Sequence, residues 1–326
     1  MGNEKNIIIT GITGQDGIFL TEKLLQKEQN YKIFGFTRNI SDKTFYFNLK
    51  YLNKKIGIEN VTLLDSKYLK NKKLSELIND IEPKYIFNMS GPSSVYESIK
   101  NPKLANEIKT IFSNLIRSCV INQQFPGIFQ ASSSEMFGKN NQKILNENSL
   151  FNPTSPYAIA KYEVHQEILE LRKKYDWNIV SGIMFNHESE FRKNDYLFMK
   201  IINFAILAKG NKQKQKLKLG SLDLKRDWSY AGDIANAAIL TLENESMCDY
   251  VLGSGSLSSI RDIVSIVFNY FSLDWEHYVE IDNSILRFSD PIERVADPSK
   301  IKSELGWETK KDVGEIIKKI IDFKLI

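Results

Sequence analysis

The stretch Ile7-Ile-Ile-Thr-Gly11-Ile-Thr-Gly14-Gln-Asp-Gly17 decides the fold. A short β-branched run leads into three glycines, and an amphipathic helical stretch at 17–27 follows. Glycine here lets the backbone approach a pyrophosphate, whose charge is favoured by the N–H groups and dipole of a helix N-terminus. Glycine also serves ordinary turns, but its position after a first strand predicts a dinucleotide site that includes Thr13, Gln15 and Asp16.

The rest of the first half alternates short β-rich runs with amphipathic stretches, which is typical of a parallel sheet covered by helices on both faces. We predict strands at 6–10, 32–37, 61–64, 85–89, 127–131 and 178–184, and helices at 17–27, 103–122 and 155–175. The fold class is therefore α/β, a doubly wound Rossmann-type parallel sheet.

From about residue 186 the alternation stops. Residues 196–208 and 259–271 have helical periodicity, whereas 216–220 and 250–252 look extended. We predict a dinucleotide-binding domain at 1–185 with a return segment at about 226–252. Residues 186–326 would form a smaller, mixed α/β substrate-binding domain.

Composition excludes several classes of protein. The 326 residues are 42% hydrophobic and 26% charged, which suits a globular chain with a large core. The N-terminus has neither a basic region nor a long apolar one, so we expect no membrane span and a cytoplasmic location. Cys119 and Cys248 lie far apart, which argues against a disulfide framework or a metal site. Lysine-rich stretches at 67–73 and 209–218 lack interleaved aromatics, so no nucleic-acid partner is expected.

The end of the second strand bears on the choice of cofactor. NAD-preferring folds place an acidic residue there to hold the ribose hydroxyls, but this chain has Thr37, Arg38 and Asn39. Arg38 could pair with a 2′-phosphate, which favours NADP over NAD, or it could be an ordinary surface arginine. Asp65 and Ser66, after the third strand, would lie at the adenine or cap a helix at 69–78.

A second motif predicts the chemistry. Ser155-Pro-Tyr157-Ala-Ile-Ala-Lys161 places a phenol and an ammonium one helical turn apart. The ammonium and a cationic nicotinamide ring would lower the pKa of Tyr157, so that it accepts a proton from a hydroxyl group near neutral pH. The preceding strand ends in Ala131-Ser-Ser-Ser-Glu135-Met-Phe-Gly138. It therefore brings hydroxyls and a carboxylate to the edge where open α/β sheets bind ligands.

These segments resemble the GDP-mannose 4,6-dehydratases, which are extended short-chain dehydrogenases/reductases acting on nucleotide-sugars. The likeness covers nearly the whole chain and includes Phe185-Asn-His-Glu-Ser189, its most specific element, with Arg226-Asp-Trp228, Asp297-Pro-Ser-Lys300 and Leu305-Gly-Trp307.

The resemblance implies a reaction on a GDP-linked hexose or heptose such as GDP-mannose or a GDP-manno-heptose. Tyr157, supported by Lys161, would deprotonate the C4 hydroxyl while hydride passes to bound NAD(P), and Ser133 would hydrogen-bond the oxygen being oxidised. The 4-keto group acidifies the C5 hydrogen. Glu135 would remove that hydrogen and help to expel the C6 hydroxyl as water, after which hydride returns to C6.

The resemblance also implies binding residues. The cofactor site would include Ser90 and, near the nicotinamide, His187. The substrate's nucleotide, diphosphate or sugar would contact a polar set made of Ser93, Asn186, Glu188, Arg192, Lys200, Arg226, Arg287 and Glu293. Helices at 103–122 and 155–175 would pair in a homodimer or homotetramer.

The chain departs from the family pattern around substrate and cofactor. Asn39 stands where a second arginine is usual, Ser94 where histidine is usual and Ser133 where threonine is usual. Glu190-Phe191 replaces Pro-Arg, and Asp290-Pro-Ile-Glu293 replaces Arg-Pro-x-Glu, so that an anion stands in the place of a cation. Two alternatives therefore stay open: a C4 dehydrogenase or epimerase that stops at the 4-keto sugar, and a non-catalytic dinucleotide-binding protein.

Overall fold

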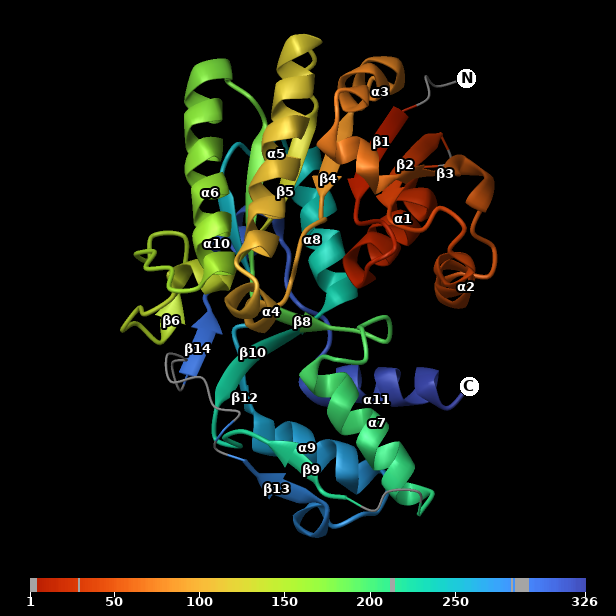
Figure 1. The fold of residues 1–326 in the computed structure, drawn as a ribbon, viewed down its shortest axis with the longest axis vertical. Coiled ribbons are helices and arrows are strands. Elements are labelled where there is room, and N and C mark those ends of the chain that lie inside the picture. The colour runs from red at the N-terminus through yellow and green to blue at the C-terminus, as the bar shows by residue number, and fades with distance from the viewer. Residues whose placement is uncertain (1–4, 29, 212–214, 283, 285–292) are drawn as a thin grey trace.

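A seven-stranded parallel sheet forms the larger part of the molecule (Figure 1). The computed structural model describes residues 5–28, 30–211, 215–282, 284 and 293–326. The sheet order is β3-β2-β1-β4-β5-β7-β11, so the chain reverses direction across the sheet between β1 and β4. Such a reversal opens a crevice at the carboxyl ends of the strands, where dinucleotides bind. The strands are β1 (Lys5–Thr10), β2 (Tyr31–Thr37), β3 (Val61–Asp65), β4 (Tyr85–Asn88), β5 (Gly127–Ser133), β7 (Ile179–Met184) and β11 (Asp249–Leu252).

Helices cover both faces of this sheet. On one face lie α3 (Lys73–Ile81), α5 (Lys103–Ile121) and α6 (Pro156–Tyr175), and on the other lie α1 (Gln15–Lys27) and α8 (Ala231–Glu243). Side chains alternate across β1, since Ile7 and Ile9 join the core with α1 and α8 while Ile8 joins the core with α3 and α5. The predicted doubly wound fold is confirmed.

A smaller part lies beyond the carboxyl ends of the strands (Figure 1). Its main sheet has the order β12-β10-β14-β6, with β8 also paired to β10, and β13 pairs with β9. The strands are β6 (Ile144–Leu145), β8 (Asn186–Glu188), β9 (Leu217–Leu219), β10 (Lys225–Tyr230), β12 (Leu257–Ser259), β13 (Val279–Ile281) and β14 (Glu293–Ala296). The helices are α7 (Leu197–Lys209), α9 (Ile260–Tyr270), α10 (Ser299–Leu305) and α11 (Val313–Lys324).

The two parts are joined by several crossings of the chain. β10 continues directly into α8, which packs on the large sheet, and β11 then forms the edge strand of that sheet. The domain limits predicted at 185 and 186 stay a prediction. Within the described part of the chain, no helix is both long and apolar enough to cross a membrane.

Three local features differ from the sequence predictions. The helix expected at 69–78 is a 3-10 helix, η2 (Ser66–Lys70), followed by α3, because the Asn71 side chain accepts a hydrogen bond from the Lys73 N–H (3.0 Å) and restarts the helix. Helix α2 (Lys43–Leu52), which we did not predict, is capped by Asp42. β5 runs two residues further than expected, to Ser133. The other short elements are η1 (Ile58–Asn60), α4 (Val95–Lys100), η3 (Ser134–Phe137) and η4 (Trp275–His277).

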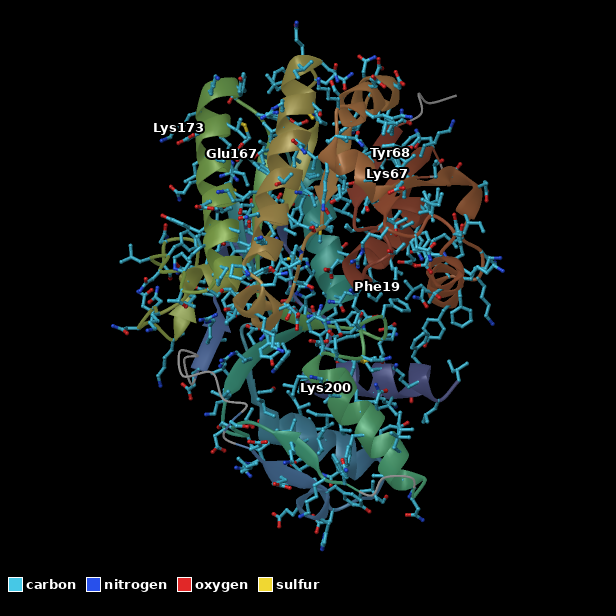
Figure 2. The ribbon with its side chains drawn as sticks, viewed as in Figure 1. Phe19, Lys67, Tyr68, Glu167, Lys173 and Lys200 are labelled. Atoms are coloured by element: carbon cyan, nitrogen blue, oxygen red, sulfur yellow. The ribbon has the colours of Figure 1, made fainter. Side chains whose placement is uncertain are left out.

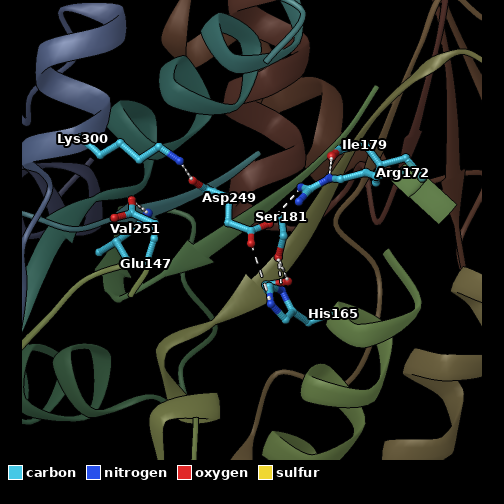
Figure 3. Close-up of polar contacts among 9 residues, drawn as sticks. Glu147, His165, Arg172, Ile179, Ser181, Asp249, Val251 and Lys300 are labelled. Carbon is cyan, nitrogen blue, oxygen red and sulfur yellow. Dashed lines mark hydrogen bonds and ion pairs between the residues drawn. The ribbon is translucent and has the colours of Figure 1, made fainter. Parts of the chain in front are cut away.

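A buried polar network fixes α6 against the sheet (Figure 3). The His165 Nδ1 lies 3.2 Å from the Ser181 hydroxyl, which is paired with the Ser132 hydroxyl at 2.7 Å. Arg172 donates to the Asp249 carboxylate at 2.8 Å and to a backbone carbonyl of β7. Because these contacts join α6 to β5, β7 and β11, they set the position from which α6 presents its first two turns.

Candidate active site

The glycine turn forms a cradle for a dinucleotide. Gly11 has a φ of +71°, which L side chains rarely adopt, and a Cβ on Gly17 would lie 2.5 Å from the Ile12 Cα. Gly14 is the N-cap of α1, so the first turn of that helix opens toward the crevice between β1 and β4. Thr13, in the same turn, lies 3.0 Å from the Thr37 hydroxyl and ties the turn to β2. This backbone cradle fits a pyrophosphate.

The ends of the next strands border the same crevice. Arg38 follows β2, is exposed, and has no ion pair within the described ranges. Asp65 caps η2 through the Lys67 N–H (2.8 Å), as the alternative interpretation expected, and Ser66 begins that helix. After β4, the Ser90 hydroxyl oxygen is buried and lacks a hydrogen-bond partner among the described residues. A buried hydroxyl without a partner fits a ligand that completes the site.

The first turn of α1 is tied to the Asn186–Glu188 strand. The Asp16 carboxylate lies 3.1 Å from the His187 Nε2, and the His187 Nδ1 lies 2.8 Å from the Phe185 carbonyl. Burial opposes charge on both, but their attraction lowers the pKa of Asp16 and raises the pKa of His187. Gln15 donates to the His187 carbonyl and accepts from the Ser189 hydroxyl. Asp16, Gln15 and His187 are therefore brought together, and they link the cradle to the smaller part.

Tyr157 and Lys161 lie on one face of α6, as their spacing predicts. Ser155 caps the helix by accepting from the Ala158 N–H, and Pro156 occupies its first turn. The Lys161 ammonium donates to the Ala131 carbonyl (2.6 Å) and lies 5.7 Å from the centre of the Tyr157 ring. Burial raises the pKa of Tyr157 to about 12 and lowers the pKa of Lys161 to about 8. The phenol therefore needs nearby positive charge to work as a base.

Ser133 and Glu135 lie beside this pair. Ser133 ends β5 and accepts a hydrogen bond from the Glu135 N–H at 3.2 Å. Burial dominates the pKa of Tyr157, but the Ser133 hydroxyl works to lower that pKa and the negative charge of Glu135 to raise it. Together with the approach of Lys161 to the Tyr157 ring, these contacts bring the four predicted catalytic side chains to one site. A residue that the sequence analysis missed also reaches it: the Arg294 guanidinium lies 3.2 Å from the Glu135 carboxylate.

A polar cluster borders the site on the side of the smaller part. The Ser93 hydroxyl lies 2.6 Å from the Tyr196 hydroxyl, and the Arg192 guanidinium lies 3.7 Å from the centre of the Tyr196 ring. Arg192 also pairs with the buried Glu188 at 3.3 Å. The positive charge of Arg192 works against burial and helps to lower the pKa of the Tyr157 phenol, so this cluster lies near the catalytic group. Tyr196 was not predicted, because nothing in its local sequence distinguishes it from a core aromatic.

The other predicted substrate residues are more scattered. Asn186 lies on β8, and Lys200 is exposed on α7 below that strand (Figure 2). Arg226 lies on β10 in register with Arg294 of β14. Glu293 faces away from Arg294, as alternate residues of a strand do, and forms ion pairs with two lysines at 3.0 and 3.1 Å. Arg287 lies outside the described residues.

Glu190 and Phe191, which depart from the family pattern, contact other elements of the fold. Glu190 is buried and accepts a hydrogen bond from the Tyr230 hydroxyl at 3.0 Å. Phe191 packs on Phe19, whose ring centre is 5.2 Å away, and on Phe323 of α11 at 5.5 Å. Figure 2 shows Phe19 at the end of α1 nearest the smaller part. These residues join α1 to the C-terminal helix.

A Rossmann-type sheet, a glycine cradle at its crevice and a Ser133, Tyr157 and Lys161 site at the carboxyl edge together define an extended short-chain dehydrogenase/reductase. The family model for GDP-mannose 4,6 dehydratase matches residues 8–320, and the chain belongs to this family. GDP-mannose 4,6 dehydratase 1 of Arabidopsis thaliana is 32% identical over 98% of this chain and 89% of its own length. The Dictyostelium discoideum GDP-mannose 4,6 dehydratase is 30% identical over 98% and 96%.

The fold is shared with solved structures at lower identity. A dTDP-glucose 4,6-dehydratase from Bacillus anthracis superposes with a TM-score of 0.83 at 18% identity, over 98% of this chain and 96% of the other. The predicted family, fold class and enzyme class are confirmed, and so is a nicotinamide dinucleotide as the cofactor of this class. The roles of the individual residues, the choice between NAD and NADP and the predicted self-association stay predictions.

Proposed function

We propose that the protein is a nucleotide-sugar 4,6-dehydratase that acts on a GDP-linked hexose or heptose. The observation that carries the proposal is that Glu135 lies beside the other proposed catalytic groups: its N–H donates to the Ser133 hydroxyl at 3.2 Å, and its negative charge adds to burial in raising the pKa of the Tyr157 phenol. A base for the C4 hydroxyl and a second base for the C5 hydrogen are what oxidation followed by elimination requires.

In the oxidation, Tyr157 takes the proton of the C4 hydroxyl. Lys161 supplies positive charge in a buried setting, and Ser133 hydrogen-bonds the oxygen as it becomes a carbonyl. When bound, the nicotinamide supplies the hydride acceptor for C4 and later the hydride donor for C6. Residues of the glycine turn, with Ser90 and the Asp16–His187 pair, would hold it.

In the elimination, Glu135 takes the C5 proton that the 4-keto group has acidified and passes a proton to the departing C6 hydroxyl, which leaves as water. Tyr157 would return its proton to C5 as C6 accepts the hydride that the cofactor would supply. The 4-keto-6-deoxy sugar therefore contains one water less than the substrate, and the cofactor ends in its starting oxidation state.

Residues on the side of the smaller part would bind the substrate. Arg192 and Arg226 suit a diphosphate because a guanidinium can bond two oxygens at once. Ser93, next to Tyr196, and Glu188, next to Arg192, would contact the sugar. Asn186, Lys200, Arg287 and Glu293 are proposed for the nucleotide end. For the cofactor, exposed Arg38 favours NADP.

The test is to identify the small molecules that copurify with the protein and then to incubate it with GDP-mannose and a GDP-manno-heptose. Mass spectrometry should show a product that has lost one water, without net reduction of the cofactor. A product that has lost only two hydrogens, with one equivalent of cofactor reduced, would identify a C4 dehydrogenase instead. Substrate recovered with an inverted C4 would identify an epimerase.

A further inference from the structure

The Glu135 carboxylate is held by a buried arginine, Arg294, of strand β14. The Arg294 Nη1 lies 3.2 Å from the Glu135 Oε1, and Arg294 is only 5% exposed, whereas the Glu135 side chain is 31% exposed. The arginine of this ion pair is thus fixed in the protein interior, whereas the carboxylate is partly exposed on the side of the site. A charge-assisted hydrogen bond of this kind restricts where the carboxylate can lie.

The guanidinium is itself locked. Its Nη2 donates to the Gly138 carbonyl at 3.0 Å, and its Nη1 approaches the Ser134 carbonyl at 3.5 Å. Gly138 has a φ of +51°, and a Cβ there would lie 1.7 Å from the Asn152 carbonyl oxygen. This glycine is therefore needed for the loop after β5 to present its carbonyl to Arg294.

Strand pairing fixes the direction in which Arg294 points. β14 is parallel to β10 on one side and to β6 on the other, and Arg226 is the register partner of Arg294. Glu293 points to the opposite face, where it pairs with Lys143 and Lys225. The side chain of Arg294 therefore points from β14 toward the loop that carries Glu135.

We propose that Arg294 is a positioning residue that holds Glu135 for removal of the C5 proton. Through this residue, β14 determines whether the 4-keto sugar goes on to lose water. This inference rests on the proposed function. Among the contacts of the described residues, no hydrogen bond or ion pair joins Arg294 to Tyr157 or Lys161, and the Lys161 ammonium donates to the Ala131 carbonyl. The oxidation at C4 should therefore proceed without Arg294.

The test compares Arg294→Met with Arg294→Lys in the full-length enzyme loaded with cofactor. With the GDP-sugar that the wild type converts, Arg294→Met should release the oxidised, non-dehydrated 4-keto sugar with reduced cofactor. Solvent deuterium uptake at C5 should fall on the order of 100-fold, because a displacement of about 1 Å can cost that much in rate. Arg294→Lys should restore part of the exchange.

Arg261→Met is the matched control. Arg261 is another arginine paired with a carboxylate, Asp223, at 2.8 Å, and it lies outside the site. The control should leave the ratio of dehydrated to non-dehydrated product unchanged. In a Glu135→Gln background, Arg294→Met should have no further effect on C5 exchange, because both changes act through one carboxylate.

A crystal structure of Arg294→Met supplies a result that does not depend on the substrate. We expect the Glu135 carboxylate to move by about 1 Å or more. A carboxylate that keeps its place, or an unchanged product ratio and C5 exchange, overturns the inference. If the wild type forms no 4-keto product from any GDP-sugar while the carboxylate still moves in the variant, the proposed function fails and the positioning role stands.

Discussion

Replacing Lys161 with methionine should remove the charge that helps Tyr157 to ionise. The ammonium lies 5.7 Å from the centre of the Tyr157 ring, and both side chains are buried. At an effective dielectric constant of about 20, a unit charge at this distance is worth roughly 3 kcal/mol, or about 2 in pKa. Because burial already raises the pKa of Tyr157 to about 12, the loss should lower the rate of C4 oxidation at pH 7 on the order of 100-fold.

The assay is the pH dependence of 4-keto product formation under saturating GDP-sugar. Burial lowers the pKa of Lys161 to about 8, so the ammonium is present at neutral pH in the wild type. In Lys161→Met the rising limb of the profile should move to higher pH by about 2, and alkaline pH should restore activity. Lys173→Met removes an exposed charge from the same helix and serves as the control (Figure 2). A Lys161→Met enzyme with wild-type rate and profile would refute the role of the ammonium.

Three further changes test other parts of the structure. Arg38→Ser should weaken NADP about 10- to 100-fold in fluorescence titrations while NAD is unaffected, since one charge-assisted contact is lost; tighter binding of NAD than NADP by the wild type would contradict the expected preference. Gly17→Ala should abolish dinucleotide binding and cost about 1–3 kcal/mol of unfolding free energy in denaturant titrations, because its Cβ would meet the Ile12 backbone; wild-type affinity would disprove the cradle. Burial lowers the pKa of His165 in the folded state, so unfolding takes up protons and the free energy of unfolding should fall as pH drops below about 6.5. In His165→Asn this pH dependence of the free energy of unfolding should be reduced, and an unchanged pH dependence would exclude His165 as its source.

The large sheet could be predicted from sequence because its determinants are local. Each buried strand is a short apolar run, and the glycines at 11, 14 and 17 stand where β1 meets α1. Helix α2 escaped prediction because aromatic residues crowd Lys43–Leu52 and obscure its period, although Phe45 and Leu49 are buried one turn apart. A side-chain hydrogen bond in a turn can override the helical pattern of the sequence, as the Asn71 contact that separates η2 from α3 shows.

The proximity of the proposed catalytic side chains could be predicted for a similar reason. Tyr157 and Lys161 are one turn apart on a single helix, and Ser133 and Glu135 belong to one loop. Arg294 could not be found in this way, because it comes from a strand 159 positions further along the chain than Glu135. The one available signal was an arginine among the apolar residues of a short strand. Such a residue has to find a buried partner, since an unpaired buried charge is costly.

The two halves of the proposed reaction depend on different parts of the fold. Apart from the binding of cofactor and substrate, the proposed oxidation needs only β5 and α6, which the buried network around His165 holds together within the large sheet. Elimination also needs β14, which is paired to β10 and β6 of the second sheet and brings Arg294 to Glu135. A change in β14, or in the residues just before it, can therefore alter the outcome at C5 and leave the chemistry at C4 intact. If the proposal holds, this separation allows departures in the sequence before β14, such as Asp290 in place of an arginine, which lies outside the described residues, to coexist with an unaltered Tyr157 and Lys161 pair.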